Sequence, residues 1–212
     1  MNRFLVLAVV LLAAASVLSA TPVCVSSTMA TLTTSGYSCE NQFLIFSNFT
    51  YSAPLGDPVA ANVNATLDSL TGAIHTAGFS FQTTAGGWLL GFDISYEVSV
   101  APDAPAGYFI IQSKDQMNPV PPTGNPAVVT DVQVGVGTFV MNNISETVIS
   151  SPYDLTTITS TTSTLTGLTS GYVLQSYEQD FFAETVPEPV SCLLIGSGLM
   201  ALALFRRRVR KS

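Results

Sequence analysis

Basic residues are nearly absent from the body of this 212-residue chain. Of the seven Lys and Arg, only Lys114 lies between residues 21 and 186. The same segment holds thirteen Asp and Glu, so its formal charge is −12, against −7 for the whole chain. Nucleic-acid binding draws its affinity from Lys and Arg that displace counterions. We therefore expect no nucleic-acid partner.

Groups suited to catalysis are also scarce. The chain has one histidine, His75, and three cysteines, which leaves little for acid–base or phosphoryl-transfer chemistry. Asp93 and Glu97 share one face of an expected strand, but four residues of strand separate them by roughly 13 Å. That separation is too large for a catalytic carboxylate pair. The sequence therefore predicts no catalytic residues and a protein that is not an enzyme.

The first twenty residues have the layout of a secretory signal peptide. Arg3 precedes an uncharged apolar run, and the small residues Ser19 and Ala20 follow it. This is the order of the charged region, apolar region and cleavage site of such peptides. A retained membrane anchor is the alternative. We expect residues 1–20 to be removed and residues 21–186 to be exported.

A second apolar segment lies near the C-terminus. Residues 190–205 carry no charge, and sixteen helical residues span about 24 Å, somewhat less than the ~30 Å bilayer core. This segment predicts a transmembrane helix, whose features also suit a plain stop-transfer anchor. By the positive-inside rule, the basic cluster after it stays cytoplasmic while the chain is anchored in the inner membrane. That cluster consists of Arg206, Arg207, Arg208, Arg210 and Lys211.

The tail resembles a known sorting signal. Pro187, Glu188 and Pro189 precede the apolar helix, and the arginine cluster follows it. This arrangement resembles the PEP-CTERM sorting signal, also called the ice-binding protein C-terminal domain, over residues 187–212. The resemblance implies recognition of the three-residue motif by exosortase, a membrane-embedded cysteine protease and transpeptidase. It also implies a Gram-negative bacterium that makes exopolysaccharide, with the protein at the cell surface or in the extracellular matrix.

Two of the three cysteines lie near the start of the exported segment. Cys24 and Cys39 are the natural disulfide pair in an oxidising periplasm, and a loop of this size gives roughly 3 kcal/mol. A metal site and a nucleophilic thiol are the alternatives, although both lack a nearby histidine. Cys192 lies in the predicted membrane helix. The segment also resembles the start of many exported PEP-CTERM proteins, through Cys24, Leu32, Gly36, Cys39, Phe46-Ser47-Asn48-Phe49 and Tyr51.

The central region has the composition and periodicity of a β protein. It is rich in Val, Ile, Thr, Phe and Tyr, with Gly and Pro at short intervals. Two segments alternate apolar residues with other residues, as in half-buried strands. The first has Phe92, Ile94, Tyr96, Val98 and Val100, and the second has Val132, Val134, Val136, Thr138 and Val140. Further strands are expected within residues 43–51, 79–83, 107–112 and 172–177, and one short helical turn within 60–71.

These segments predict an all-β fold, an antiparallel β-sandwich of seven to ten strands over residues 21–186. The signal peptide and the transmembrane helix flank it. Turn signals separate the strands, including the four prolines between Asn118 and Pro126. The Ser/Thr-rich residues 155–170 predict either an exposed strand or a flexible stalk.

The leading hypothesis is a non-enzymatic exported protein that exosortase sorts to the surface or matrix, where exopolysaccharide is a possible partner. We expect no cofactor and no fixed metal site. Calcium is the cation that suits an acidic exported surface. Its candidate ligands, expected in loops or near strand ends, are Asp57, Asp103, Asp115 and Asp131.

The alternative hypothesis is a carbohydrate-binding module. Sugar-binding sites place aromatic rings against the sugar, and the candidates here are Trp88, Tyr96 and Tyr108. Ice binding is a weaker form of this alternative because it needs a flat, regular array of threonines. The Thr-rich segment offers only one short alternating run, Thr157, Thr159, Thr161 and Ser163.

Overall fold

The computed structural model describes residues 21–70, 75–84, 86–120, 128–141, 146–149, 153–165 and 173–186. The predicted signal peptide and the predicted sorting tail lie outside these residues. Within them the chain forms twelve strands, one short α-helix, α2 (Met29–Leu32), and one 3-10 turn, η1 (Ala60–Asn62). No helix in this part of the chain is both long enough and apolar enough to cross a membrane.

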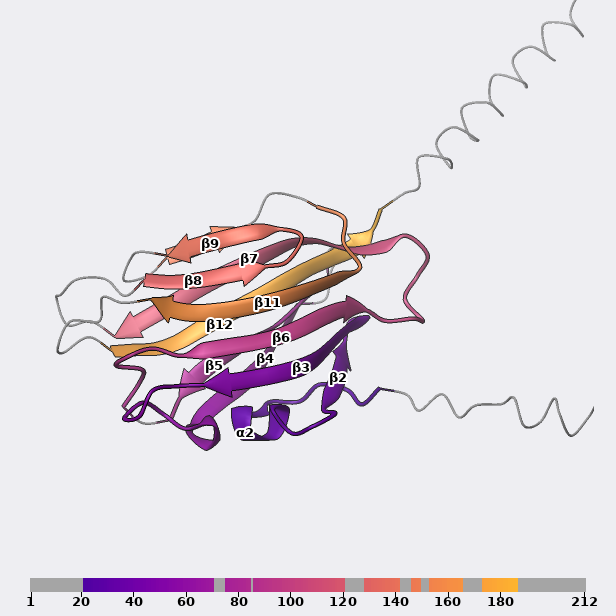
Figure 1. Cartoon of the computed structure of the whole chain (residues 1–212). Coiled ribbons are helices and arrows are strands. Elements are labelled where there is room, and N and C mark those ends of the chain that lie inside the picture. The colour runs from indigo at the N-terminus through magenta and orange to yellow at the C-terminus, as the bar shows by residue number, and fades with distance from the viewer. Residues whose placement is uncertain are drawn as a thin grey trace, which may run out of the picture.

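The strands form two six-stranded antiparallel sheets that lie face to face (Figure 1). The back sheet has the order β1 (Ser27–Thr28), β4 (Val63–Leu70), β5 (His75–Thr83), β12 (Val173–Thr185), β7 (Tyr108–Val120) and β10 (Glu146–Ile149). The front sheet has the order β2 (Ser38–Asn41), β3 (Leu44–Ser52), β6 (Asp93–Val100), β11 (Thr157–Leu165), β8 (Val128–Gln133) and β9 (Gly137–Met141). The predicted all-β, antiparallel, two-sheet architecture is therefore confirmed.

Strand β6 follows its sequence pattern. Ile94, Tyr96 and Val98 are buried, and Asp93 on the opposite face is exposed. This alternation places every second side chain in the core, because successive side chains of a strand point to opposite faces. The alternation predicts a strand from Trp88 to Val100, and its second part is confirmed as β6 (Asp93–Val100).

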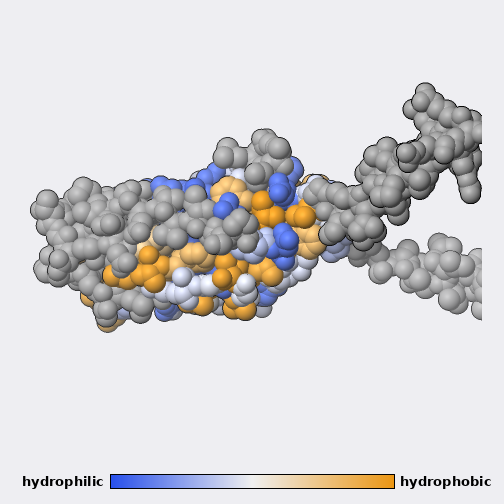
Figure 2. Space-filling view, turned by 90° about the horizontal axis from the view of Figure 1, so that it is seen from above, coloured by the Kyte–Doolittle hydropathy of each residue, from blue (hydrophilic) through white to orange (hydrophobic). Residues whose placement is uncertain are grey.

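The prediction for residues 132–140 is wrong in both its continuity and its face. A turn at residues 134–136 separates β8 from β9. Val132, Val134 and Val140 are exposed, and Val134 shows 64% of its surface. Asp131 and Gln133 occupy the inward positions of β8 instead. Figure 2 looks down on the side that carries β9 and shows hydrophobic residues at the surface beside hydrophilic ones.

Three other segments agree with expectation only in part. The short helical turn expected within residues 60–71 is present as η1, and the residues after it form strand β4, which the sequence did not predict. Strand β7 continues to Val120, into the expected turn, because β12 pairs with it as far as Val173↔Val120. In the Thr-rich segment, the strand alternative is correct for residues 157–165, which form β11, and the stalk alternative is wrong there. Because β6 and β8 pair with its two sides, β11 is a central strand.

Strands β3, β5, β6 and β12 supply an aromatic half of the core. Six rings pack between β3 and β6 of the front sheet and β5 and β12 of the back sheet. Their centroids lie 5.2–6.3 Å apart, within the range of favourable edge and stacked contacts. This aromatic half consists of Phe46, Phe49, Phe79, Phe81, Tyr96 and Phe181.

The described domain begins and ends at the same end of the sandwich (Figure 1). Strand β12 stops at Thr185, and the next residue, Val186, donates its backbone N–H to the Gly107 carbonyl at 2.7 Å. This hydrogen bond fixes the last described residue to the body of the domain. The sorting motif begins with the following residue, Pro187.

Candidate functional site

The second half of the core is polar rather than aromatic. Asp115 on β7 and Asp131 on β8 belong to opposite sheets, and neither has any exposed surface. Two glutamine amides join them. Gln179 Nε2 lies 2.9 Å from Asp115 Oδ1 and 2.6 Å from Asp131 Oδ2, and Gln133 Nε2 lies 2.7 Å from Asp131 Oδ2. Each amide can donate two hydrogen bonds, so the glutamines hold the two carboxyl groups together.

Four hydroxyl groups complete this arrangement. Tyr177 donates to Asp115 Oδ1 at 2.8 Å, and Ser113 donates to Gln133 Oε1 at 2.7 Å. Tyr96 donates to Gln179 Oε1. Ser160 Oγ lies 2.8 Å from Asp131 Oδ1. We call this set the polar network; it comprises Ser113, Asp115, Asp131, Gln133, Ser160 and Gln179, with the hydroxyls of Tyr96 and Tyr177.

Burial controls the protonation of the polar network. Desolvation raises the pKa of Asp115 well above its ordinary value, and the charge of Asp131 raises it further. The hydrogen bonds from Tyr177 and Gln179 lower this pKa only in part. The pair of aspartates therefore keeps a proton at a pH where an exposed aspartate has lost it. The six network residues are at most 1% exposed, so the network is closed to a macromolecular substrate and holds the two sheets together.

A second group of charges lies on the outer face of the back sheet. Lys114 Nζ lies 2.6 Å from Glu178 Oε1 and 2.6 Å from Asp180 Oδ2. Carboxylate oxygens of Asp68, Glu178 and Asp180 lie within 4.8 Å of one another. We call these four residues the outer acidic cluster. Strands β7 and β12 thus carry polar groups on both faces: Lys114, Glu178 and Asp180 outside, with Asp115 and Gln179 inside.

An ion pair usually raises the pKa of its base and lowers the pKa of its acid. In the outer acidic cluster only Lys114 follows this rule, because the pKa of Asp180 is raised as well. Burial lowers the pKa of Lys114, but hydrogen bonds and charges from Asp180 and Glu178 outweigh burial and raise it overall. Burial raises the pKa of Asp180 to about 6, although Lys114 lowers it. The charges of Glu178 and Asp68 also raise the pKa of Asp180. Asp180 is therefore a buried carboxylate that a single lysine does not fully compensate.

The four aspartates proposed as calcium ligands do not form one site. Asp57 accepts backbone N–H groups from Leu89 at 2.6 Å, Leu90 at 2.9 Å and Gly91 at 2.9 Å, which commits its carboxylate to a loop. Asp103 is exposed at a turn. Asp115 and Asp131 lie within strands and the core, not in loops. The expectation of a loop or strand end is therefore wrong for Asp115, which lies in the middle of β7, whereas Asp131 lies two residues before the end of β8 but faces the core.

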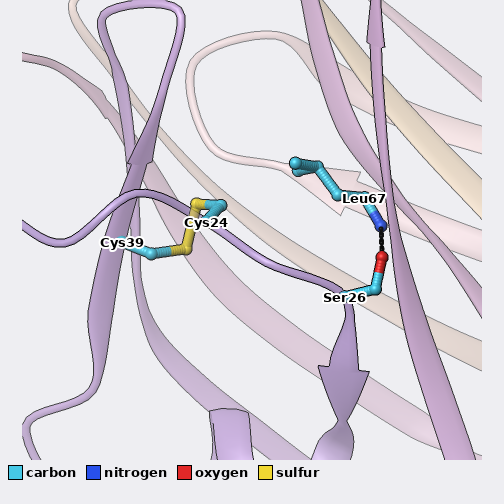
Figure 3. The surroundings of a disulfide bond; sticks show 4 residues. All are labelled: Cys24, Ser26, Cys39 and Leu67. Atoms are coloured by element: carbon cyan, nitrogen blue, oxygen red, sulfur yellow. Dashed lines mark hydrogen bonds between the residues drawn. A yellow bond between two sulfur atoms is a disulfide. The ribbon is translucent and has the colours of Figure 1, made fainter.

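Cys24 and Cys39 form a disulfide, as the sequence predicts (Figure 3). It joins the segment before β1 to strand β2. Cys24 N–H donates to the Glu40 carbonyl at 2.9 Å beside it. Further along the same segment, Ser26 Oγ accepts the Leu67 N–H of β4 at 3.1 Å (Figure 3). The N-terminal segment is thus attached to both sheets.

The aromatic residues proposed as sugar-binding platforms lie inside the protein. Trp88, Tyr96 and Tyr108 are all buried. Trp88 donates from Nε1 to the Tyr51 hydroxyl at 3.0 Å, and Tyr108 donates to the Gln42 carbonyl at 3.0 Å. Their ring faces therefore stabilise the core and are not available to a carbohydrate.

His75, the single histidine, is partly buried. Its ring centroid lies 6.4 Å from that of Phe43 and 6.0 Å from that of Tyr108.

Sequence reasoning missed the glutamines and serines of the polar network and the residues of the outer acidic cluster. The available signal was the polar residues inside apolar strands, such as Gln133 between two valines.

The sorting motif Pro187, Glu188 and Pro189 and the basic tail lie outside the described residues. No protein-family model, curated protein or solved structure matches the chain. The functional argument therefore depends on the residues of this chain.

Proposed function

We propose that this chain is a non-enzymatic exported protein that exosortase sorts to the cell surface or extracellular matrix. The body of the chain is a self-contained acidic sandwich, and the two ends supply the export and sorting signals. Before processing, the predicted helix of residues 190–205 holds the chain in the inner membrane with a cytoplasmic basic tail. After processing, the acidic sandwich remains outside the membrane, where exopolysaccharide is its expected surroundings.

The observation that carries this proposal is that the last described strand, β12, ends two residues before the motif. Strand β12 ends at Thr185, Val186 is tied to Gly107, and Pro187 begins the motif. Cleavage at or after the motif would remove no residue of the described fold. The motif thus follows directly on the last described strand, which supports a sorting signal that can be cut without cutting the sandwich.

Two further features support export. The Cys24–Cys39 disulfide is of a kind that persists in oxidising compartments. The described domain holds one Lys and no Arg, so it has little affinity for the anionic surface of a membrane once the basic tail is removed. Asp115 and Asp131, two core carboxyl groups that share the Gln179 amide as a donor, are enclosed by hydrogen bonds and have no exposed surface. This favours a structural role for them over hydrolytic chemistry.

The test compares processing of two single variants in the native host and in a strain that lacks exosortase. Glu188→Ala removes the charged residue of the motif. Glu184→Ala is the matched control, because it changes a glutamate four residues earlier, within β12. The measurement is the mass and the membrane, surface and medium distribution of the protein after cell fractionation.

The wild-type chain and Glu184→Ala are expected to leave the membrane fraction at a reduced mass. Glu188→Ala, and the wild-type chain in the exosortase deletion strain, are expected to stay in the membrane fraction at the unprocessed mass. Equal processing and distribution in all four samples would exclude exosortase sorting.

A further inference from the structure

The outer acidic cluster lies along one row of paired residues that crosses the back sheet. Asp68 on β4 and Asp180 on β12 each pair with Gly78 on β5, which lies between them. Lys114 on β7 pairs with Asp180 from the other side. Side chains at paired positions project to the same face of a sheet. Asp68 and Asp180 therefore stand on the two sides of a strand position that has no side chain.

Gly78 gives the carboxyl group of Asp180 the space that it occupies. A Cβ atom at position 78 would lie 2.6 Å from Asp180 Oδ1 and 2.0 Å from the Gln179 carbonyl oxygen. Since Asp180 Oδ2 faces Lys114 on β7, Oδ1 points the other way, over Gly78 toward Asp68. The absence of a side chain at residue 78 thus allows two carboxyl groups from non-adjacent strands to approach each other.

Asp180 Oδ1 is a buried acceptor with no hydrogen-bond donor in the described part of the chain. Asp180 as a whole is only 1% exposed, so bulk water does not solvate this atom. An unsatisfied buried acceptor, and a charged one above all, is strongly unfavourable. A second carboxylate on the open side of Asp180 Oδ1 makes the arrangement worse unless a positive charge lies between them.

The net charge of the cluster indicates which kind of ligand would balance it. Three carboxyl groups and one ammonium leave a formal charge of −2 when all are ionised. Lys114 contacts Glu178 Oε1 and Asp180 Oδ2 and leaves the side facing Asp68 uncompensated. A divalent cation has the charge that balances this set. The donors are all carboxylate oxygens, which favour hard cations such as Ca²⁺ over the metals that prefer nitrogen or sulfur.

We propose that Asp68, Glu178 and Asp180 form a calcium-binding site on the outer face of the back sheet. Asp180 Oδ1 is the innermost ligand, above Gly78, and Asp68 closes the site from β4. Lys114 stays beside Glu178 and Asp180 as a second positive charge and weakens the affinity. Three carboxylates supply fewer than the six to eight oxygens that Ca²⁺ takes, so water supplies the rest. Such a site belongs to the range of extracellular modules, with a Kd on the order of 10⁻⁴–10⁻³ M.

The test is calcium titration of the full-length chain in a mild detergent, followed by thermal unfolding and by calorimetry. Asp68→Asn removes a partly exposed ligand and should not disturb the core. Asp180→Asn removes the buried ligand. Asp103→Asn is the matched control, because Asp103 is an exposed aspartate in a turn of the same domain. Lys114→Met removes the competing positive charge.

For the wild-type chain and Asp103→Asn, we expect a calcium-dependent rise in Tm of a few degrees at concentrations above Kd. Asp68→Asn and Asp180→Asn should weaken binding by about tenfold or more, since each removes a charged ligand. Lys114→Met should bind calcium about thirtyfold more tightly, as expected for removal of a unit charge about 4 Å from a doubly charged ion in a solvated site.

Three results would overturn the site. One is a wild-type chain that neither binds calcium by calorimetry nor changes Tm at about 10 mM, tenfold above the expected Kd range. Another is a calcium response of Asp68→Asn equal to that of the wild-type chain. The third is a Lys114→Met variant that binds calcium no more tightly than the wild-type chain, as expected of a plain salt-bridge cluster. None of these results depends on exosortase sorting, so the two proposals fail separately.

Discussion

The two halves of the core stabilise the same sandwich by different means. In the aromatic half, Phe46, Phe79 and their neighbours pack as rings. In the polar half, the carboxyl groups of Asp115 and Asp131 share donors from Gln133 and Gln179. Tyr96 lies at the boundary, since its ring packs on Phe181 and its hydroxyl donates to Gln179.

This difference shows how an acidic chain with few cations can bury carboxyl groups. The aromatic half depends on apolar area, which tolerates small shifts of geometry. The polar half depends on complete hydrogen bonding, because one missing donor leaves a buried acceptor unsatisfied. It also depends on a retained proton, because two buried carboxylates side by side repel each other. The halves should therefore differ in their response to mutation and to pH.

The largest effect is expected in the aromatic half. Phe79→Ala removes a fully buried ring whose centroid lies 5.2 Å from that of Phe46 and 5.7 Å from that of Phe49. Such a truncation typically lowers the free energy of unfolding by about 3–5 kcal/mol. Chemical denaturation of the oxidised protein measures it.

Val134→Ala is the control, because Val134 is 64% exposed and its truncation should change stability by no more than about 0.5 kcal/mol. If Val134→Ala were as destabilising as Phe79→Ala, the valine face of residues 132–140 would belong to the core after all.

Loss of the disulfide should follow in size. Cys24→Ser with Cys39→Ser opens a covalent link of sequence separation 15, for which the chain-entropy relation gives about 3 kcal/mol. Denaturation midpoints of the double variant and of the reduced wild-type protein should agree. A double variant as stable as the oxidised wild-type protein would show that the hydrogen bonds around Cys24 and Ser26 hold the N-terminal segment without the covalent bond.

Breaking the polar half should be somewhat less destabilising. Gln179→Leu removes the amide that donates to both aspartates at 2.9 Å and 2.6 Å, and leaves the Tyr96 hydroxyl without its acceptor. We expect a loss of about 2 kcal/mol, the range for unsatisfied buried polar groups. Gln82→Leu is the matched control at an exposed position of β5. Equal stability of the two variants would mean that the polar network contributes nothing to folding.

The pH dependence should be the smallest effect at any one pH, and it has a defined sign. The folded-state pKa of Asp115 is raised, so its contribution to stability is complete below the ordinary aspartate pKa of about 3.9. As pH rises toward the folded-state pKa, the unfolded chain releases a proton that the folded chain keeps. The free energy of unfolding therefore falls by up to about 1.4 kcal/mol per pH unit in that window.

Asp115→Asn should flatten this slope. The asparagine amide can replace the hydrogen bond that the protonated carboxyl group makes to Asp131, and it cannot lose a proton. Asp131 on β8, Tyr177 on β12 and Tyr96 on β6 are the other titratable groups that face this position. A slope that Asp115→Asn leaves unchanged would assign the pH dependence to a group outside the polar network.

The sequence was sufficient for the architecture but not for the second half of the core. The alternation of Ile94, Tyr96 and Val98 identifies β6 correctly because apolar packing alone determines which face is buried. The same rule fails at Val132 and Val134, where Asp131 and Gln133 face inward. Their partners, Asp115 and Gln179, lie 16 or more positions away in sequence on the opposite sheet. A single strand's pattern contains no information about those partners.

The candidate site shows the same limit. The Cys24–Cys39 pair could be predicted, since the exported context leaves these two cysteines as the natural pair. The outer acidic cluster could not be predicted, because Asp68 and Asp180 meet only through their common partner Gly78, two strands apart in the sheet. The alternation along each strand places Asp68 and Asp180 on the outer face of the sheet, but only the strand order brings them together.

The most direct test of the proposed function is the intact mass of the protein isolated from the surface or medium of its native host. Sorting through the tail predicts a chain that begins near residue 21, carries the Cys24–Cys39 disulfide, and ends at or soon after the motif Pro187–Pro189. The predicted helix and the basic residues Arg206 to Lys211 should be missing from it. A surface or medium protein that retains residues 190–212 would contradict the proposal.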